Sequence, residues 1–420
     1  MWPGRRFQTV AGQMQMSRAT DSPTNPPTAG LERLLAINQV VGPLNRELLE
    51  DLASRGVRCK ALAGWVDAES GRRLPFEVLP ARPLIKAPTW KRLWSWGVFT
   101  LQAVAAAVRH RRWPMLVTSN PPWVMLAMPL LGRLLGVRYV LLIYDIYPDV
   151  MERMGRCRRG GLVSRLWRRL SRRSLLRAAG VITIGRHMAE TLGGHLRPGE
   201  RLDIEIIPNW ADTGFIRPLP KVDNPFAREH RLVDKFVVSY SGALGATHDT
   251  ESIIAAAKML ADLPDVHFLI IGGGTRWREV CELVAASGLA NLTLLPLQPF
   301  SALPQSLTVA DAAIVCLDEG YEGVSVPSKT YYALAAGASI LAVSPEDTEL
   351  TDLVAEHNCG LHVPPRRPDL LAEAVRRLHD DRGLLKSFKA ASVAAAREHF
   401  DRHLATGHYL ALLRRSFGGA

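Results

Sequence analysis

Short apolar runs alternate with longer segments of helical spacing along the first half of the chain. The runs are predicted to be strands and lie at 34–38, 57–65, 115–118, 139–144, 181–184 and 204–207. The segments between them place apolar residues three or four positions apart, as on one face of a helix, at 44–55, 90–110, 124–135, 162–179 and 188–192. Strands that alternate with helices form mostly parallel sheets covered on both faces. We therefore expect an α/β domain over residues 29–212.

The same alternation restarts near residue 236, after a segment from 208 to 230 that carries four prolines and no helical period. Predicted strands lie at 236–240, 268–271, 292–295, 312–316 and 339–343, and predicted helices at 251–263, 277–287, 329–336 and 350–357. We expect a second α/β domain over 213–395, and over 396–420 a helix that packs back on the first domain. The fold class is thus two doubly wound domains, whose strand-end loops would line a common cleft.

Composition narrows the class of protein. Of 420 residues, 47% are hydrophobic and 22% charged, which excludes disorder, collagen and coiled coil as the main architecture. Residues 1–28 are polar and rich in proline, and we expect a disordered arm there. The longest apolar segment, 123–132, is shorter than the roughly 20 residues that a spanning helix needs, so no transmembrane helix is expected.

Cysteine usage argues against two kinds of site. The five cysteines are scattered without a C-x-x-C pair, which indicates neither a disulfide framework nor a zinc site. We expect a reducing, cytoplasmic compartment, no metal ion and no cofactor.

The positive charge is concentrated in the first half. Fifty-two basic and forty acidic residues give a net charge of +12. The segment 152–177 alone holds ten arginines and a single acid, Glu152. We expect a helix with arginines on one face and leucine or tryptophan on the other, lying on the cytoplasmic membrane as a peripheral attachment. A solvated charged face is the alternative. The residues proposed to meet the membrane are Trp90, Trp94, Arg165, Arg168, Arg169, Arg172 and Arg173.

Candidate phosphate-binding chemistry lies at two turns of the second half. The strand 236–240 ends in Ser241-Gly242-Ala243-Leu244-Gly245, where glycines let backbone N–H groups approach a phosphate. Lys329 follows Pro327-Ser328 at a predicted helix start and would add an ammonium to the same positive end. A structural tight turn and a solvated lysine are the alternatives.

A set of short motifs from 208 to 365 resembles the nucleotide-sugar half of glycosyltransferase family 4. In chain order the motifs are Ile207-Pro208-Asn209-Trp210, Tyr240-Ser241-Gly242, Ile270 to Gly274, Ala310-Asp311-Ala312, Val326-Pro327-Ser328-Lys329, Ala335-Ala336-Gly337 and Cys359 to Pro365. The first half is similar to the polysaccharide-building branch of the family, in Ser119-Asn120-Pro121-Pro122, Tyr144 to Asp149 and Ile184 to Met188.

The resemblance implies a GT-B fold of two Rossmann-like domains, with the nucleotide-sugar donor in the second, the acceptor in the first, and transfer with retention. It also implies that no divalent metal is used, and the chain has no Asp-x-Asp that would chelate one to a diphosphate. We expect a glycosyltransferase that moves a sugar from a nucleotide-diphosphate sugar to a lipid-linked glycan at an anionic membrane. No recognisable nucleic-acid module is present, so a nucleic-acid partner is not expected.

The resemblance also points to the site residues. Asp145 and Lys329 are the candidates for catalysis, Asp145 because it follows an apolar strand and would face the second domain as a base. A loop aspartate that caps a turn is the alternative. The expected donor contacts are Gly242, Leu244, Gly245, Gly272, Gly273, Gln298, Glu322, Ser328 and Tyr332. The expected acceptor-side residues are Asn38, Gly42, Asn120 and Arg186.

The chain departs from the family at four donor-side positions. Ala243 and His248 stand where most members have an arginine and a lysine, and the paired glutamates would fall on Val324 and Tyr332. Two other functions therefore stay open: a basic membrane or nucleic-acid binding protein with a decayed donor site, and a nucleotide-sugar epimerase of the same architecture.

Overall fold

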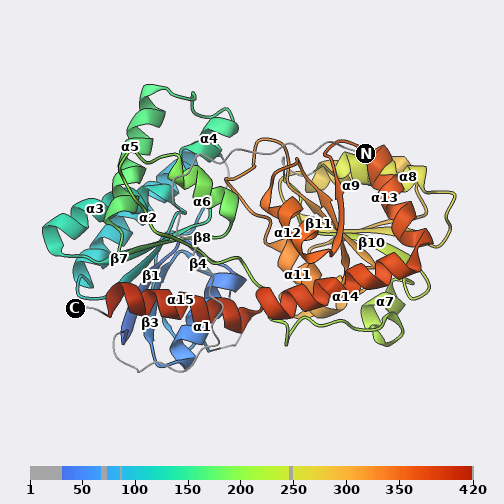
Figure 1. The fold of residues 1–420 in the computed structure, drawn as a ribbon, viewed down its shortest axis with the longest axis horizontal. Coiled ribbons are helices and arrows are strands. Elements are labelled where there is room, and N and C mark those ends of the chain that lie inside the picture. Colours follow the sequence, from blue (N-terminus) through green and yellow to red (C-terminus); the bar gives the residue numbers. More distant parts are fainter. Residues whose placement is uncertain (1–30, 68–72, 86–87, 246–248, 419–420) are drawn as a thin grey trace.

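The computed structural model describes residues 31–67, 73–85, 88–245 and 249–418, and arranges them as two α/β domains side by side (Figure 1). The arm expected at 1–28 and His248 lie outside the described residues. Helices α14 (Arg382–His399) and α15 (Arg402–Phe417) run one after the other along the same side of both domains.

The first domain is built on a seven-stranded sheet in the order β5-β3-β1-β6-β7-β8-β9, in which every neighbouring pair is parallel. Its strands are β1 (Arg33–Ile37), β3 (Arg58–Ala63), β5 (Glu77–Pro80), β6 (Met115–Thr118), β7 (Tyr139–Ile143), β8 (Gly180–Thr183) and β9 (Ile204–Ile206). A separate pair joins β2 (Val40–Val41) to β4 (Trp65–Val66). The helices are α1 (Pro43–Ser54), α2 (Thr89–Arg109), α3 (Pro122–Leu135), α4 (Asp149–Arg153), α5 (Leu162–Arg177) and α6 (Arg186–Gly193).

Both faces of this sheet are covered, as its apolar strands predict. In β1, Leu34 and Ala36 pack toward one core, with α1 and α15, while Leu35 and Ile37 pack toward the other, with α2, α3 and α5. This alternation follows from the two-residue period of a strand, and it requires apolar side chains at successive positions.

The second domain contains a six-stranded parallel sheet in the order β12-β11-β10-β13-β14-β15. Its strands are β10 (Phe236–Ala243), β11 (Val266–Gly273), β12 (Leu292–Pro296), β13 (Ala312–Cys316), β14 (Ser339–Val343) and β15 (Gly360–Val363). The helices before α14 are α7 (Pro225–Glu229), α8 (Thr250–Met259), α9 (Trp277–Ser287), α10 (Leu303–Thr308), α11 (Lys329–Ala335), α12 (Glu349–His357) and α13 (Pro368–Asp380), with 3-10 turns η1 (Lys221–Asp223) and η2 (Phe300–Ala302).

Strands β10 and β11 extend beyond the predicted 236–240 and 268–271. Their parallel pairing continues through Gly242 opposite Gly272 and Ala243 opposite Gly273. The predicted glycine turns are therefore partly strand, and the missing side chains of Gly272 and Gly273 leave room for Leu244 and Leu297 beside them.

The chain passes between the domains at two neighbouring places. Ala211 donates its N–H to the carbonyl of Phe400 (3.0 Å), and Arg402 donates its N–H to the carbonyl of Ala211 (3.0 Å). The break between helices lies at 400–401, so the boundary that we expected at 396 falls inside α14. Helix α15 then packs on the first domain, where Leu413 and Tyr409 are fully buried.

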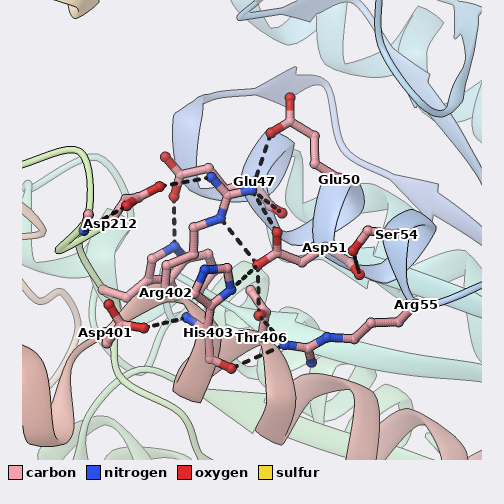
Figure 2. Close-up of polar contacts among 12 residues, drawn as sticks. Glu47, Glu50, Asp51, Ser54, Arg55, Asp212, Asp401, Arg402, His403 and Thr406 are labelled. Carbon is pink, nitrogen blue, oxygen red and sulfur yellow. Dashed lines mark hydrogen bonds and ion pairs between the residues drawn. The ribbon is translucent and has the colours of Figure 1, made fainter.

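An ion-pair cluster fastens α15 to α1 and to the connection between the domains (Figure 2). The Arg402 guanidinium lies 2.7 Å from Asp51, 3.3 Å from Glu50 and 3.2 Å from Asp212. Close by, the buried Trp210 indole donates to Glu47 (2.8 Å), and burial raises the pKa of Glu47 to about 7. One cation thus serves several buried carboxylates.

We predict that Arg402→Ala lowers the free energy of unfolding by about 3 kcal/mol, because the buried Asp51 and the half-buried Asp212 lose the guanidinium that pairs with them. Arg415→Ala is the matched control: it removes a guanidinium from the same helix, but one that is 62% exposed and that pairs with Glu205 (2.9 Å). The control is expected to cost at most about 1 kcal/mol. Urea denaturation followed by circular dichroism measures both, and equal losses would contradict the role given to Arg402.

Candidate active site

Lys329 reaches from the start of α11 to the end of β10. Its Nζ donates to the Tyr240 hydroxyl (2.8 Å) and lies 4.0 Å from the centre of that ring, and the hydroxyl donates to the Ala243 carbonyl (2.6 Å). A Cβ placed on Gly242 would lie 3.5 Å from the same Nζ, and the φ of +145° at Gly242 favours glycine. The structure thus brings together the two turns that the sequence singled out.

The Lys329 ammonium has no ion pair with a carboxylate among the described residues. Burial lowers the pKa of Lys329 to about 8, because desolvation disfavours the charged form. A bound anion would restore the lost stabilisation. This point of the second domain is therefore suited to a diphosphate.

The glycines beside it have packing roles. A Cβ on Gly272 would lie 2.7 Å from the Leu244 side chain, and one on Gly273 would lie 3.0 Å from Leu297. The Leu244 N–H is engaged by the Gly273 carbonyl (2.7 Å), so this amide is not directed at a ligand. Contacts of Gly272 and Gly273 with a nucleoside stay predictions.

The other residues that we expected to contact the donor lie in the loops after β10 and β12 and at the start of α11. Gly245 ends the described stretch after β10, and Ser328 directly precedes α11. The Gln298 amide donates to the Pro296 carbonyl (2.8 Å) in the loop after β12. Tyr332, one turn after Lys329, is half-buried on the side that faces Glu47 of the first domain, and burial raises its pKa.

Glu322 does not fit the donor role that we expected. Its carboxylate lies 3.2 Å from the guanidinium of Arg153 in the first domain, and it also accepts from the Gly320 N–H (3.0 Å). Arg153 donates in addition to the Gly320 carbonyl (2.9 Å). The side chain is thus committed to a contact between the domains.

Three acceptor-side candidates and Asp145 lie at one edge of the first sheet. Asn38, Asn120 and Asp145 follow the carboxyl ends of β1, β6 and β7, which are neighbours in the sheet, and Gly42 directly precedes α1. The Asn38 side chain accepts from the Val40 N–H (3.2 Å), and the Asn120 carbonyl accepts from Thr118 (3.1 Å).

Asp145 is held by its backbone, whereas its carboxylate is unengaged. Its N–H and that of Tyr144 donate to the Ser119 hydroxyl (3.1 and 3.0 Å). No described residue forms a hydrogen bond or an ion pair with the carboxylate, and burial raises its pKa to about 6. The group is thus suited to accept a proton from a hydroxyl near neutral pH.

Arg186 also differs from its expected acceptor role. Its guanidinium lies 2.5 Å from Glu356 and 3.6 Å from Asp352, and its N–H donates to the Glu349 carboxylate (2.7 Å). Glu349 occupies the space that a Cβ on Gly185 would need, at 2.7 Å. The carboxylates of α12 therefore hold Arg186, and they fix the start of α6 to the second domain.

The loop between β13 and α11 completes this contact. Val324 is fully buried within a core of the first domain, and a Cβ on Gly323 would lie 2.7 Å from the Thr191 hydroxyl. The two sets of strand-end loops thus meet directly at this point. Elsewhere in the interface, Arg46 lies over the Phe300 ring (5.2 Å).

Within the described ranges, no group of three or more His, Cys, Asp or Glu side chains is arranged to hold a metal ion. In those same ranges, no helix is both long and apolar enough to span a membrane.

Comparison with known proteins assigns the family. The model of the glycosyl transferase 4-like domain matches residues 41–210, and that of the glycosyl transferases group 1 matches residues 223–394. The chain therefore belongs to the glycosyltransferases that these two models describe. It is 29% identical to the probable glycosyltransferase WbjE of Pseudomonas aeruginosa over 276 residues. This aligned region covers 66% of this chain and 68% of that protein.

Two further comparisons agree. The putative colanic acid biosynthesis glycosyl transferase WcaI of Escherichia coli K12 is 28% identical over 298 residues, which is 69% of this chain and 72% of that protein. The crystal structure of HepE from Anabaena superposes with a TM-score of 0.69 at 15% identity, covering 91% of this chain and 99% of that chain. The predicted GT-B fold is confirmed.

Helix α5 of this glycosyltransferase does not carry all of its arginines on one exposed face, contrary to our expectation. Arg168 lies 3.1 Å from Asp149 and 3.0 Å from Glu152, and Arg172 is buried in an ion pair with Glu200. These two arginines therefore do not face a membrane, because acids distant in sequence draw them toward the protein.

The exposed side of α5 combines charge and apolar surface. Arg165, Arg169 and Arg173 are exposed at intervals of four residues. Exposed leucines lie beside them, with Leu162 82% and Leu166 59% accessible. On α2, Trp90 and Trp94 are exposed as well.

We predict that binding of a nucleoside diphosphate weakens as pH rises through the Lys329 pKa of about 8. Below that pH the ammonium is charged, and above it the affinity should fall about tenfold for each pH unit, because the cation is lost. Isothermal titration between about pH 7.5 and about pH 10 measures this, within the range where lysine titrates. Lys329→Arg, which stays charged, should flatten the dependence, and Lys329→Met should bind weakly throughout. A wild-type affinity that is independent of pH would contradict the assignment.

Proposed function

We propose that this glycosyltransferase moves a sugar from a nucleotide-diphosphate sugar to a lipid-linked glycan, with retention and without a metal ion, during polysaccharide assembly. The observation that carries the proposal is the half-buried Lys329 ammonium beside Gly242, which has no carboxylate partner among the described residues. The name of the relative WcaI refers to colanic acid biosynthesis, which supports a polysaccharide product.

Charge balance explains why one cation at this position matters. When the bond from the sugar to the diphosphate breaks, negative charge collects on the departing phosphate oxygens. A charge-assisted hydrogen bond from Lys329 is worth about 1.5–3 kcal/mol and would act on that charge. The HepE structure is described as a complex with UDP and glucose, which supports a nucleotide-sugar donor here.

Asp145 is proposed to act on the acceptor side. It lies at the carboxyl edge of the first sheet with Asn38 and Asn120, and its carboxylate is free to accept the proton of a hydroxyl. The departing phosphate can take that proton as well, so Asp145 is expected to assist and to orient the acceptor.

The exposed faces of α2 and α5 are proposed to rest on an anionic membrane. Indole rings suit the headgroup zone, and each arginine near an anionic leaflet contributes about 1 kcal/mol. Trp90, Trp94, Arg165, Arg169 and Arg173 carry this part of the proposal. Attachment there would bring the first domain to an acceptor that is embedded in lipid.

The proposed function is tested by incubating the protein with uridine, guanosine and adenosine diphosphate sugars and membrane extract, in EDTA. We expect a glycosylated lipid from one nucleotide class, with the anomeric configuration of the donor retained. A free nucleotide sugar with an inverted sugar centre would indicate the epimerase, and no product from any of the donors would indicate a decayed site. Either result would contradict the proposal.

We predict that Asp145→Asn lowers kcat roughly 10²-fold, within the range of general acid–base effects, while the affinity for nucleotide is unchanged. Because the carboxylate forms above its pKa of about 6, wild-type activity should rise through that pH, and the variant should lose this limb. Steady-state rates against pH test this, and an unchanged kcat would remove Asp145 from the reaction.

We predict that Arg165→Ser/Arg169→Ser/Arg173→Ser weakens binding to phosphatidylglycerol vesicles at least about tenfold, since three surface cations are lost. The control removes three exposed arginines of the second domain, Arg228, Arg278 and Arg377, which have no ion pair with a described residue. Co-sedimentation measures both. Equal losses would show that net charge, and not the α5 surface, determines binding.

A further inference from the structure

A basic cleft lies at the edge of the first sheet opposite to Asp145. It has a volume of about 550 Å³, and its lining includes Glu32, Arg33, Arg111, Arg112, Trp113 and Arg138. Apart from Phe417 at the end of α15, its residues precede or begin β1, β6 and β7, whereas Asn38, Asn120 and Asp145 follow the other ends of the same strands. The cleft is therefore separated from the candidate active site by the length of the sheet.

Within the part of the chain that the structure describes, acids do not balance the charges of this cleft. Four of the lining residues are arginines and one, Glu32, is an acid. Arg33, Arg111 and Arg112 form no ion pair with any carboxylate of the described residues, and Arg138 donates to the Ser416 carbonyl (2.7 Å). All four arginines are exposed and line the same concave surface. Like charges that share a concave surface repel, and an anion between them would offset this repulsion.

Three cationic side chains lie close to the Trp113 ring at the cleft. The Arg33 and Arg58 guanidinium carbons lie 5.8 and 5.9 Å from the centre of the Trp113 ring, and Lys60 Nζ lies 5.3 Å from it. Such contacts hold a cation over an indole and limit the positions that its side chain samples. The basic groups at this edge are thus positioned, and they do not simply extend into solvent.

We propose that this cleft is a second anion site, which binds a phosphate group through the guanidinium groups of Arg33, Arg111, Arg112 and Arg138. The planar guanidinium presents two parallel N–H donors that match two phosphate oxygens. The volume lies within the range of small-ligand sites, about 300–1,000 Å³, and admits a diphosphate or a phosphorylated headgroup.

Two sources would supply such a group. One is a soluble phosphorylated compound, and the other is the headgroup of an anionic lipid. Helix α3 ends at the cleft, and its Leu130 and Leu134 are 61% and 66% exposed. These exposed apolar side chains are the reason to test a lipid source. The phosphate chemistry is the same in both cases.

The test compares Arg111→Ala/Arg112→Ala with the control Arg228→Ala/Arg377→Ala, each in full-length protein that also carries Lys329→Ala. The last change removes the donor-side ammonium, so that binding at the proposed site is measured separately. All four arginines of the two pairs are exposed and without an ion pair to a described residue, so both pairs are expected to fold, which circular dichroism checks.

In the first arm, inorganic pyrophosphate is titrated by calorimetry. We expect the Arg111/Arg112 pair to weaken binding at least about tenfold, as the loss of one charge-assisted contact predicts, and the control to change it little. In the second arm, the same proteins are floated with phosphatidylcholine vesicles, with and without phosphatidylglycerol. Selective loss with pyrophosphate supports a soluble phosphate, and selective loss with anionic vesicles alone supports a lipid headgroup. No binding in either arm, or equal losses in the two pairs, would overturn the proposal.

Discussion

The Lys329 ammonium lies half-buried against Tyr240 and Gly242, and no carboxylate of the residues that the structure describes pairs with it; the donor site that we propose depends on this constraint. A desolvated cation that the protein does not neutralise is an energetic cost to the fold alone. The cost is offset when an anion binds. The absence of a side chain at Gly242 keeps the space beside Nζ open, so the same arrangement supplies both charge and access.

The two domains are joined by charged contacts at two separate places. At the crossing between them, Arg402 ties α15 to α1 and to Asp212 (Figure 2). At the strand-end loops, α12 carboxylates bind the start of α6 through Arg186, and Val324 enters a first-domain core. These contacts set the strand ends that precede α6 in the first domain against the loop that leads to Lys329.

Local sequence signals predicted the architecture well. Short apolar runs separated by helical periods predicted the order of the main strands and helices, since burial on both faces demands such runs. The Gly242 turn and Lys329 were also recognised locally, because both stand at the end of a strand or the start of a helix. Short, half-exposed strands such as β5 were missed, since they lack a continuous apolar run.

Roles that depend on distant partners were not predictable. Arg186, Arg172 and Glu322 were assigned to ligand or membrane as unpaired charges, but Glu356, Glu200 and Arg153 pair with them across 170, 28 and 169 residues. The spacing of apolar residues along the chain carries no information about charged partners that lie so far apart in the sequence. The extension of β10 through Gly242 depended in the same way on its partner strand β11.

A crystal structure with a bound nucleoside diphosphate tests the central claim most directly. The terminal phosphate is expected within hydrogen-bond distance of Lys329 Nζ, about 3 Å, over the Gly242 end of β10. A diphosphate held elsewhere, with Lys329 still bonded only to Tyr240, would contradict the assignment of the donor site.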